Sequence, residues 1–319
     1  MVRTALKRRA QGAAIILAML IAALAAAVAV AVAAEQQRWF ADVADRRDQV
    51  QAQALALAGV QWARQIMQDD ARAGTIDHLG EAWAYPLPRT PLENGSIEGR
   101  IEDAQGRLNI NNLATDDGLG KEEKARLGRL FAQRGIAPRT VDAIAASLLS
   151  IPESSGMQGA GAAGVGATGN GGPGNSTSPP TLPRNLRPVR ASEMAATRGV
   201  SVREVTLMLP FVVALPAATV LNVNTATPDV LAAAIPGLSA DALATLVADR
   251  ARKPFATLAD FRSRLPSGAT VPNETALGVA SSYFLVSVRA RQGTTLAQAR
   301  ALLRRDGREW PIVVWQVLE

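Results

Sequence analysis

The side chains that most often carry out chemistry in proteins are scarce in this chain. Its 319 residues include no Cys and a single His, His78. Without Cys there are no disulfides, thiolate zinc sites or thiol nucleophiles, and one His excludes multi-histidine metal sites. A Ser-His-Asp triad would depend entirely on His78. The composition therefore argues against most familiar active-site chemistry.

Asparagine is the polar residue with a repeated spacing. Residues 108–114 have the sequence LNINNLA, and residues 221–227 have the related sequence LNVNTAT. Each copy alternates apolar residues with Asn and is followed by helical sequence, so these side chains are suited to capping a helix or closing a turn. The residues concerned are Asn109, Asn111, Asn112, Asn222 and Asn224. Two copies indicate two related helical units.

The second copy continues into a segment, 221–265, that resembles the helix-hairpin-helix modules of DNA-uptake receptors. In such a module a hairpin with two glycines lets backbone N–H groups approach a phosphate. Here the hairpin is 236–239, and Ser239 stands in place of the second glycine. The helix that follows offers no basic residue before Arg250. DNA binding stays an alternative, and a role in packing or protein contacts is favoured.

These residues must be positioned by a chain that begins with a membrane-type segment. Residues 1–12 contain four basic residues and no acid, and residues 13–34 contain no polar side chain. As a helix the second stretch is about 33 Å long, enough to cross a bilayer core with its basic flank on the cytoplasmic side. The four basic residues supply most of the formal net charge of +6, because the chain from Ala13 onward has 30 Lys and Arg against 28 Asp and Glu.

Three interpretations of this segment compete. It is a signal peptide cut near 32–34, a plain uncleaved anchor, or a type IV prepilin leader cut between Gly12 and Ala13. The third would leave the apolar helix in place. Pilin helices usually carry Glu at the fifth mature position, where this chain has Leu17.

Beyond the membrane the pattern predicts an α+β fold. Apolar residues recur at helical spacing from Glu35 to about Asp70, so one long helix packed against a sheet is expected. Its aromatic residues Trp39, Phe40 and Trp62 are assigned to a packed core, with contact to another protein as the alternative. Residues 71–96 resemble a loop, and 96–110 alternate as two strands around a turn near 105–106.

The C-terminal end is predicted to add strands, and the middle of the chain to add helices. Residues 282–292 have strand character, and Asp306-Gly307 is a two-residue hairpin signal between two further strands. Between about 112 and 280 short helical patterns dominate, interrupted by a Gly-, Ala-, Ser- and Pro-rich tract at 156–182 that predicts a flexible loop. Walker spacing is lacking there, which argues against a phosphate-binding loop.

Taken together, these features resemble the minor pseudopilin K family of bacterial type II secretion systems over nearly the whole chain. The matching stretches are the leader ending at Gly12, the apolar helix with Leu17, and the sequences EDAQGRLNINNL (102–113), ASEM (191–194) and LNVNTAT (221–227).

The resemblance implies an organisation in five parts. They are a prepilin leader (1–12), a transmembrane helix (13–34), the first part of a type IV pilin-like core (35–111), a large inserted helical domain of two SAM-like or helix-hairpin-helix-like units (112–280), and C-terminal core strands (281–319). The expected core is a long helix packed on a small antiparallel sheet.

The resemblance also implies a role. A prepilin peptidase would cut after Gly12 and methylate the amine of Ala13. The protein would be a non-enzymatic subunit at the tip of the periplasmic pseudopilus, anchored once in the inner membrane with its C-terminal domain in the periplasm. Its partners would be pseudopilins I and J, other pseudopilins, the inner-membrane secretion platform and secreted substrates. No nucleic acid is expected.

Calcium is the one cofactor that the resemblance raises. Some members bind it in the inserted domain, next to an acidic stretch whose counterpart here, 145–156, holds only Glu153. Residues 116–118 (DDG) lack the spacing of an EF-hand loop. No cofactor is expected with certainty, calcium stays open, and no ligands can be assigned to it.

Overall fold

The computed structural model describes residues 2–115, 117–150 and 188–319, and for residues 2–14 it describes the helical backbone alone. The Gly-rich tract 156–182, predicted to be a loop, lies outside the described residues.

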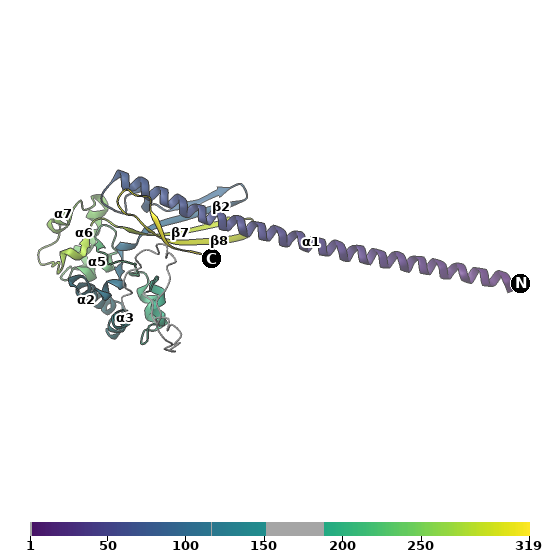
Figure 1. Ribbon diagram of the computed structural model, residues 1–319, viewed down its shortest axis with the longest axis horizontal. Coiled ribbons are helices and arrows are strands. Elements are labelled where there is room, and N and C mark those ends of the chain that lie inside the picture. The colour runs from purple at the N-terminus through teal and green to yellow at the C-terminus, as the bar shows by residue number, and fades with distance from the viewer. Residues whose placement is uncertain (1, 116, 151–187) are drawn as a thin grey trace, which may run out of the picture.

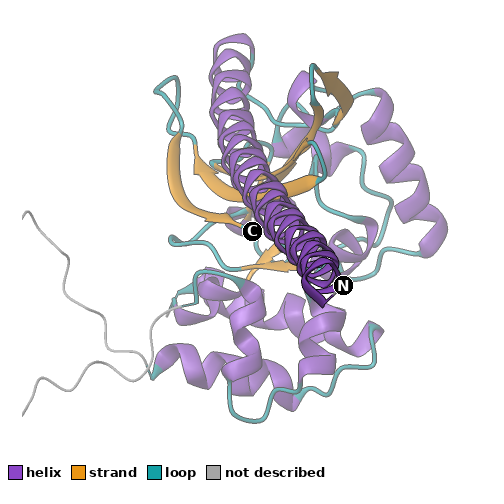
Figure 2. Ribbon diagram, turned by 90° about the vertical axis from the view of Figure 1, so that its right-hand side faces the viewer, coloured by secondary structure: helices purple, strands orange, loops and turns teal. Residues whose placement is uncertain are grey.

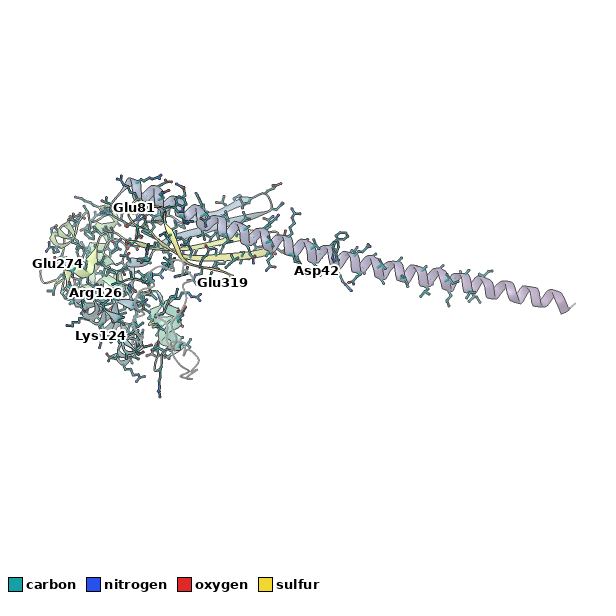
Figure 3. The ribbon with its side chains drawn as sticks, viewed as in Figure 1. Asp42, Glu81, Lys124, Arg126, Glu274 and Glu319 are labelled. Atoms are coloured by element: carbon teal, nitrogen blue, oxygen red, sulfur yellow. The ribbon has the colours of Figure 1, made fainter. Side chains whose placement is uncertain are left out.

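A single helix, α1 (Val2–Ala73), runs from the N-terminus into the globular part and along it (Figure 1). Its first half projects alone, as Figure 1 shows, and Asp42 lies on this projecting part (Figure 3). Apolar side chains in this half, such as Leu17 and Leu20, are about 60% exposed. By length and composition the helix can cross a membrane. The prediction of one continuous helix from the apolar segment to about residue 70 is confirmed.

The rest of α1 packs on one face of a five-stranded antiparallel sheet, with the strand order β1-β2-β7-β8-β9. The strands are β1 (Leu87–Leu92), β2 (Gly95–Asp103), β7 (Tyr283–Gln292), β8 (Thr295–Arg304) and β9 (Ile312–Leu318). Figure 2 shows α1 lying across this sheet. Because side chains alternate along a strand, one face of the sheet is apolar and meets Ala52, Ala56, Val60 and Met67 of α1.

The predicted strand at 282–292 is confirmed as β7, and the region after it pairs as β8 and β9. The two-residue turn lies elsewhere than predicted. Gln292 pairs with Thr295 across Gly293-Thr294, with Gly293 at φ +53°. Asp306-Gly307 instead belongs to a longer connection, 305–311, before β9.

Two predictions for residues 71–110 were wrong. Part of the predicted loop is β1, which contains Pro88 and Pro91. Proline has no N–H to donate to a neighbouring strand, and β1 tolerates it because it lies at the edge of the sheet and has a neighbour on one side only. The second strand of the expected pair is only Leu108–Asn109 (β3), and it pairs in parallel with β4 (Val212–Val213) instead of folding back on β2.

The aromatic residues of α1 also depart from the prediction of a packed core. Trp39 and Phe40 are 62% and 63% exposed, and Trp62 is 50% exposed. The first two lie on the part of α1 before the sheet, whose β7–β8 turn sits against Asp48. Trp39 and Phe40 therefore have no sheet to pack on.

Between β2 and β7 the chain forms a helical domain at the end of the sheet farthest from the N-terminus (Figure 1). Its helices are α2 (Gly118–Gln133), α3 (Arg139–Leu149), α4 (Val202–Met208), α5 (Pro228–Ala234), α6 (Ala240–Arg252) and α7 (Leu258–Ser263). Short 3-10 turns join them, η3 (Ile110–Ala114), η4 (Ala191–Ala196) and η5 (Glu274–Ala276) among them. Their apolar side chains form a core separate from that between α1 and the sheet.

The close approach of α1 to the sheet depends on Gly59. A Cβ on this residue would lie 2.6 Å from Cγ1 of Val288, a side chain that is stiff because it branches at Cβ. In α2, by contrast, a Cβ on Gly128 would meet nothing within 4 Å.

We expect Gly59→Ala to destabilise the protein by about 1–3 kcal/mol, because overpacking outweighs the better helix propensity of Ala. The matched change Gly128→Ala should stabilise it by up to about 1 kcal/mol. Urea unfolding of the full chain in detergent, followed by tryptophan fluorescence, measures both. Equal effects of the two changes would contradict a tight helix–sheet contact at Gly59.

Candidate functional site

The two asparagine motifs make the same local turn. The side-chain oxygen of Asn109 accepts a hydrogen bond from the N–H of Asn111 (3.1 Å), and that of Asn222 accepts one from the N–H of Asn224 (2.9 Å). Each Asn ends a two-residue parallel strand, β3 in the first copy and β5 (Leu221–Asn222) in the second, where β5 pairs with β6 (Leu277–Gly278). The motifs are thus related in structure as well as in sequence.

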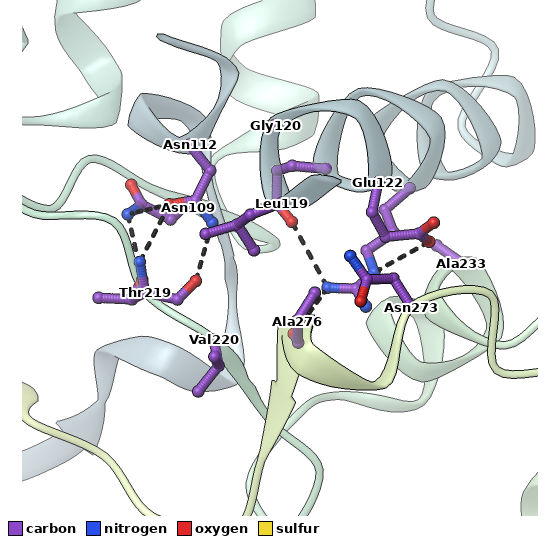
Figure 4. A network of polar contacts seen from close by, with 12 residues as sticks. Asn109, Asn112, Leu119, Gly120, Glu122, Thr219, Val220, Ala233, Asn273 and Ala276 are labelled. Atoms are coloured by element: carbon purple, nitrogen blue, oxygen red, sulfur yellow. Dashed lines mark hydrogen bonds and ion pairs between the residues drawn. The ribbon is translucent and has the colours of Figure 1, made fainter. Parts of the chain in front are cut away.

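The first copy binds a distant segment of the helical domain. The amide of Asn109 donates to the side chains of Asn112 (3.0 Å) and Thr219 (3.1 Å). Asn112 in turn donates to the carbonyl of Thr219 (2.8 Å), and its side-chain oxygen accepts from the N–H of that residue (3.1 Å). Figure 4 shows these three residues pointing toward one another. Asn111 donates to the carbonyl of Leu215 (2.9 Å).

The second copy reaches out of the helical domain into the sheet. The amide of Asn222 donates to the carbonyl of Asp77 (3.1 Å), to Oδ2 of Asp103 (3.0 Å) and to Oγ of Ser281 (3.0 Å). Asn222 is fully buried. Asp103 is the last residue of β2, and Ser281 shortly precedes β7. Asn222 therefore lies where the helical domain joins the sheet.

The remaining residue of the repeat, Asn224, serves the helical domain alone. Its amide donates to the carbonyl of Phe255 and its oxygen accepts from the N–H of that residue, at 3.0 and 2.8 Å.

Asp103 gathers several donors at this junction. Its Oδ2 also accepts from the hydroxyls of Thr225 (2.5 Å) and Ser281 (2.7 Å), and its Oδ1 accepts from the N–H of Gln105 (2.8 Å). Burial raises the pKa of Asp103 to about 6, although the hydrogen bonds from Thr225, Ser281 and Gln105 act to lower it.

An arginine completes the network on the side of α1. Arg305, which follows β8, contacts Oδ2 of Asp70 at 2.6 Å and Oδ1 of Asp77 at 2.5 Å. Asp77 also accepts from the N–H of Ser281 (2.7 Å). Burial, and next the charge of Glu81, raise the pKa of Asp70 to about 6, while Arg305 lowers it. The end of α1, the ends of the sheet and the helical domain are thus held by one buried polar network.

We name this network the junction and define it by Asp70, Asp77, Asp103, Asn222, Thr225, Ser281 and Arg305. Of these, sequence reasoning singled out only Asn222. The others were missed because their partners lie far away along the chain: Asp103 and Asn222 differ by 119 in residue number, and Asp77 and Arg305 differ by 228.

Two junction aspartates and the neighbouring Glu81 form a group of carboxylates close enough to suggest a cation. Ligand atoms of Asp70, Asp77 and Glu81 lie within 4.8 Å of one another. However, Arg305 pairs with both aspartates, and Glu81 accepts hydrogen bonds from the N–H of His78 and from Nε1 of Trp83, both at 2.8 Å. The carboxylates already have cationic or hydrogen-bonding partners within the protein, so these residues do not fit a calcium site. Glu153 lies outside the described residues, and calcium binding stays a prediction without ligands.

A second buried charge lies inside the helical domain, on α2. Arg126 is fully buried between Glu122 and Glu123 and donates to the carbonyl of Ala276 (3.0 Å). Burial raises the pKa of Glu123 to about 7 despite the nearby Arg126. This arrangement ties α2 to η5.

Two residues of the hairpin segment that the DNA-binding alternative would involve, Ser239 and Arg250, serve the fold instead. Ser239 caps α6 by accepting from the N–H of Ala242 (3.2 Å). Arg250 is buried and donates to the carbonyls of Val223 (2.7 Å) and Ala226 (2.8 Å), so it does not face solvent. This geometry argues against phosphate binding by the hairpin.

Comparison with known proteins decides the family. Two models described as type II secretion system (T2SS), protein K, match residues 106–217 and 221–280. The chain belongs to the type II secretion system protein K family. Protein K of Pseudomonas aeruginosa is 29% identical over 295 residues, covering 88% of this chain and 84% of that protein. Protein K of Pectobacterium carotovorum is 26% identical, covering 97% and 96%.

The fold agrees with this membership. A chain in the crystal structure of the GspK-GspI-GspJ complex from enterotoxigenic Escherichia coli superposes with a TM-score of 0.68, covering 87% of this chain and 99% of that chain at 23% identity. An α+β fold with a long N-terminal helix on an antiparallel sheet is therefore confirmed. As a member of the protein K family, the chain is a structural pseudopilin of the cell envelope and not an enzyme.

The junction predicts a specific sensitivity to loss of one amide. We expect Asn222→Ala to destabilise the protein by about 2–4 kcal/mol, because three acceptors at the junction lose a buried donor. Asn94, which is exposed in the β1–β2 turn, provides the control, and Asn94→Ala should stay within about 0.5 kcal/mol. Urea unfolding of the full chain measures both. A small effect of Asn222→Ala would show that the junction does not hold the two parts together.

Proposed function

We propose that this protein is the minor pseudopilin at the tip of the type II secretion pseudopilus, where it initiates assembly and helps to export folded proteins. The observation that carries the proposal is the family membership joined to the long projecting helix with a bulky domain at its far end. We further propose that α1 and the five-stranded sheet form a type IV pilin-like core. The helical domain is then an insertion of two helix-hairpin-helix-like units.

The proposed location follows from α1. Its apolar part crosses the inner membrane once, with the basic N-terminal residues in the cytoplasm and the globular part in the periplasm. Trp39 and Phe40, exposed just beyond the apolar segment, suit the membrane–water interface.

The tip position rests on Leu17 and on the helical domain. A buried terminal amine costs several kcal/mol unless it is paired, and a subunit with Glu at the fifth position brings a partner for the amine of the subunit above it. Leu17, exposed on α1, brings none. The helical domain, at the end of the molecule opposite the N-terminus, would block further stacking above.

The processing step predicts the mature N-terminus. We expect prepilin peptidase to cut between Gly12 and Ala13, so protein purified from membranes should begin with methylated Ala13. Gly12→Ala should leave the leader attached and abolish secretion, because the proposed cleavage signal is a short basic leader that ends in glycine. N-terminal sequencing and mass spectrometry check this result. A mature protein that starts at Glu35 would instead identify a soluble exported protein.

Assembly is proposed to use the exposed apolar stripe of α1, formed by Trp39, Val43 and Val50. These residues recur at helical spacing on one face, which suits packing against the helices of neighbouring pseudopilins I and J. The inner-membrane platform and secreted substrates would meet other surfaces.

We expect the full chain to co-purify with pseudopilins I and J at equal stoichiometry from detergent. The double variant Val43→Asp/Val50→Asp should lower recovery of the complex at least about tenfold, since burying each apolar side chain contributes about 1.5–3 kcal/mol. Gln37→Asp/Gln49→Asp adds the same charge at exposed polar positions of α1 and should retain the complex. Retention of the complex in both variants would place the contact away from the stripe, and loss in both would show that added charge alone disrupts the complex. Absence of a complex with the unaltered chain would contradict the tip proposal.

A further inference from the structure

The two faces of the sheet differ sharply in chemistry. On β7, Phe284, Val286 and Val288 turn toward α1 and are buried, while Ser287 and Arg289 turn away from it. The pairing register carries the same alternation across the sheet, so that Arg100 and Arg300 both lie opposite Ser287. The face away from α1 is therefore polar and charged.

We name this surface the arginine face and define it by its basic residues. They are Arg89, Arg100, Arg107, Arg289, Arg291 and Arg300. The carboxylates among them are Glu98 and Glu102, which leaves an excess of four positive charges. Because the chain from Ala13 onward is almost neutral, this excess is a local concentration of charge.

The two glutamates neutralise only part of the arginine face. Glu98 lies 3.7 Å from Arg289, and Glu102 lies 3.4 Å from Arg100 and 3.5 Å from Arg107. Elsewhere in the described parts of this chain some exposed cationic groups have carboxylate partners, as in the helical domain, and others, such as Arg198 and Arg203, have none.

Three arginines remain available on this face. Arg291 and Arg300 are exposed, and within the described residues neither lies within 4.0 Å of a carboxylate. Arg89 has only the hydroxyl of Ser96 as a hydrogen-bond partner there, at 3.1 Å.

The arginine face is also hollowed. A groove of about 490 Å³ runs over it, with Leu285 and Ser287 among its lining residues and Trp315 of β9 at one side. The end farthest from the membrane segment is closed, because Val213 and Leu215 pack there with Tyr283 and Leu302. The groove thus offers guanidinium groups beside apolar surface, as a polypeptide partner with both acidic and apolar side chains requires.

We propose that the arginine face is a docking surface for an acidic polypeptide segment of a partner protein. Guanidinium groups bind carboxylates through paired hydrogen bonds, and the unpaired Arg291 and Arg300 supply them. This assignment stands on the charge and shape of the sheet and does not depend on the tip position.

A lipid surface fits the arginine face less well. The β7–β8 turn, the end of the sheet nearest the N-terminus, lies beside Asp48. From Ala34 to Asp48 an upright helix rises about 21 Å, whereas attraction between exposed charges is screened within about 10 Å at 0.1 M salt. Duplex DNA fits less well too, because protein–DNA interfaces are strongly polar and positively charged, whereas Leu285 and Trp315 line this groove and two glutamates lie among its arginines.

The test measures binding of a fluorescein-labelled decaglutamate peptide by fluorescence anisotropy. The full chain is held in phosphatidylcholine nanodiscs at 50 mM NaCl. The variant Arg289→Gln/Arg291→Gln/Arg300→Gln is compared with Arg198→Gln/Arg203→Gln/Arg308→Gln, which removes the same charge from exposed positions elsewhere. A single variant, Arg300→Gln, guards against misfolding of the triple variant.

We expect the triple variant to bind the peptide at least about tenfold more weakly and Arg300→Gln about threefold more weakly, with the control within about twofold of the unaltered chain. Equal loss in the control would overturn the proposal, as would absence of binding by the unaltered chain. Duplex DNA and phosphatidylglycerol vesicles are tested in parallel. If either of them binds through the same arginines more tightly than the peptide, the partner is not an acidic polypeptide.

Discussion

The structure depends on a few buried polar groups that satisfy one another where three parts of the chain meet. Asp103, with four donors on its two oxygens, could not remain buried without Asn222, Thr225 and Ser281. The same constraint fixes the end of α1, because Arg305 needs Asp70 and Asp77 at once. Buried polar networks favour a single arrangement, since any slip of one element leaves several groups unpaired. The junction therefore sets how the helical domain is oriented on the sheet, and so what a partner at the end of the molecule would meet.

Local sequence patterns predicted the elements that depend on local physics. The uninterrupted apolar and amphipathic periodicity gave α1, and the alternation of 282–292 gave β7. The edge strand β1 escaped because Pro88 and Pro91 normally indicate a loop, and only its place at the edge makes them acceptable. The exposed aromatics Trp39 and Phe40 were misjudged because periodicity shows that a face is apolar without showing what covers it.

The candidate site was predicted only in part, for a different reason. The repeated motif identified Asn109 and Asn222 as residues that close turns, and each does so. Nothing near Asn222 in the sequence indicates that its amide also reaches Asp77, Asp103 and Ser281. Arg250 shows the same limit. The sequence identifies it only as the first basic residue after the hairpin, whereas in the structure it donates to two backbone carbonyls inside the helical domain. Contacts between distant segments require the fold before they can be recognised.

The strand order has a consequence for how the chain reaches its folded state. Strands β2 and β7 are neighbours in the sheet, yet the whole helical domain separates them along the chain. During synthesis the N-terminal parts emerge first, and closing so long a loop is slow. The helical domain has its own apolar core and can collapse early, whereas Ala52, Val60 and Met67 on α1 stay uncovered until β7 and β8 are made. A nascent molecule thus exposes this apolar face of α1, beside its membrane anchor, until nearly all of the chain has been synthesised. During this interval it is most prone to associate prematurely with other molecules.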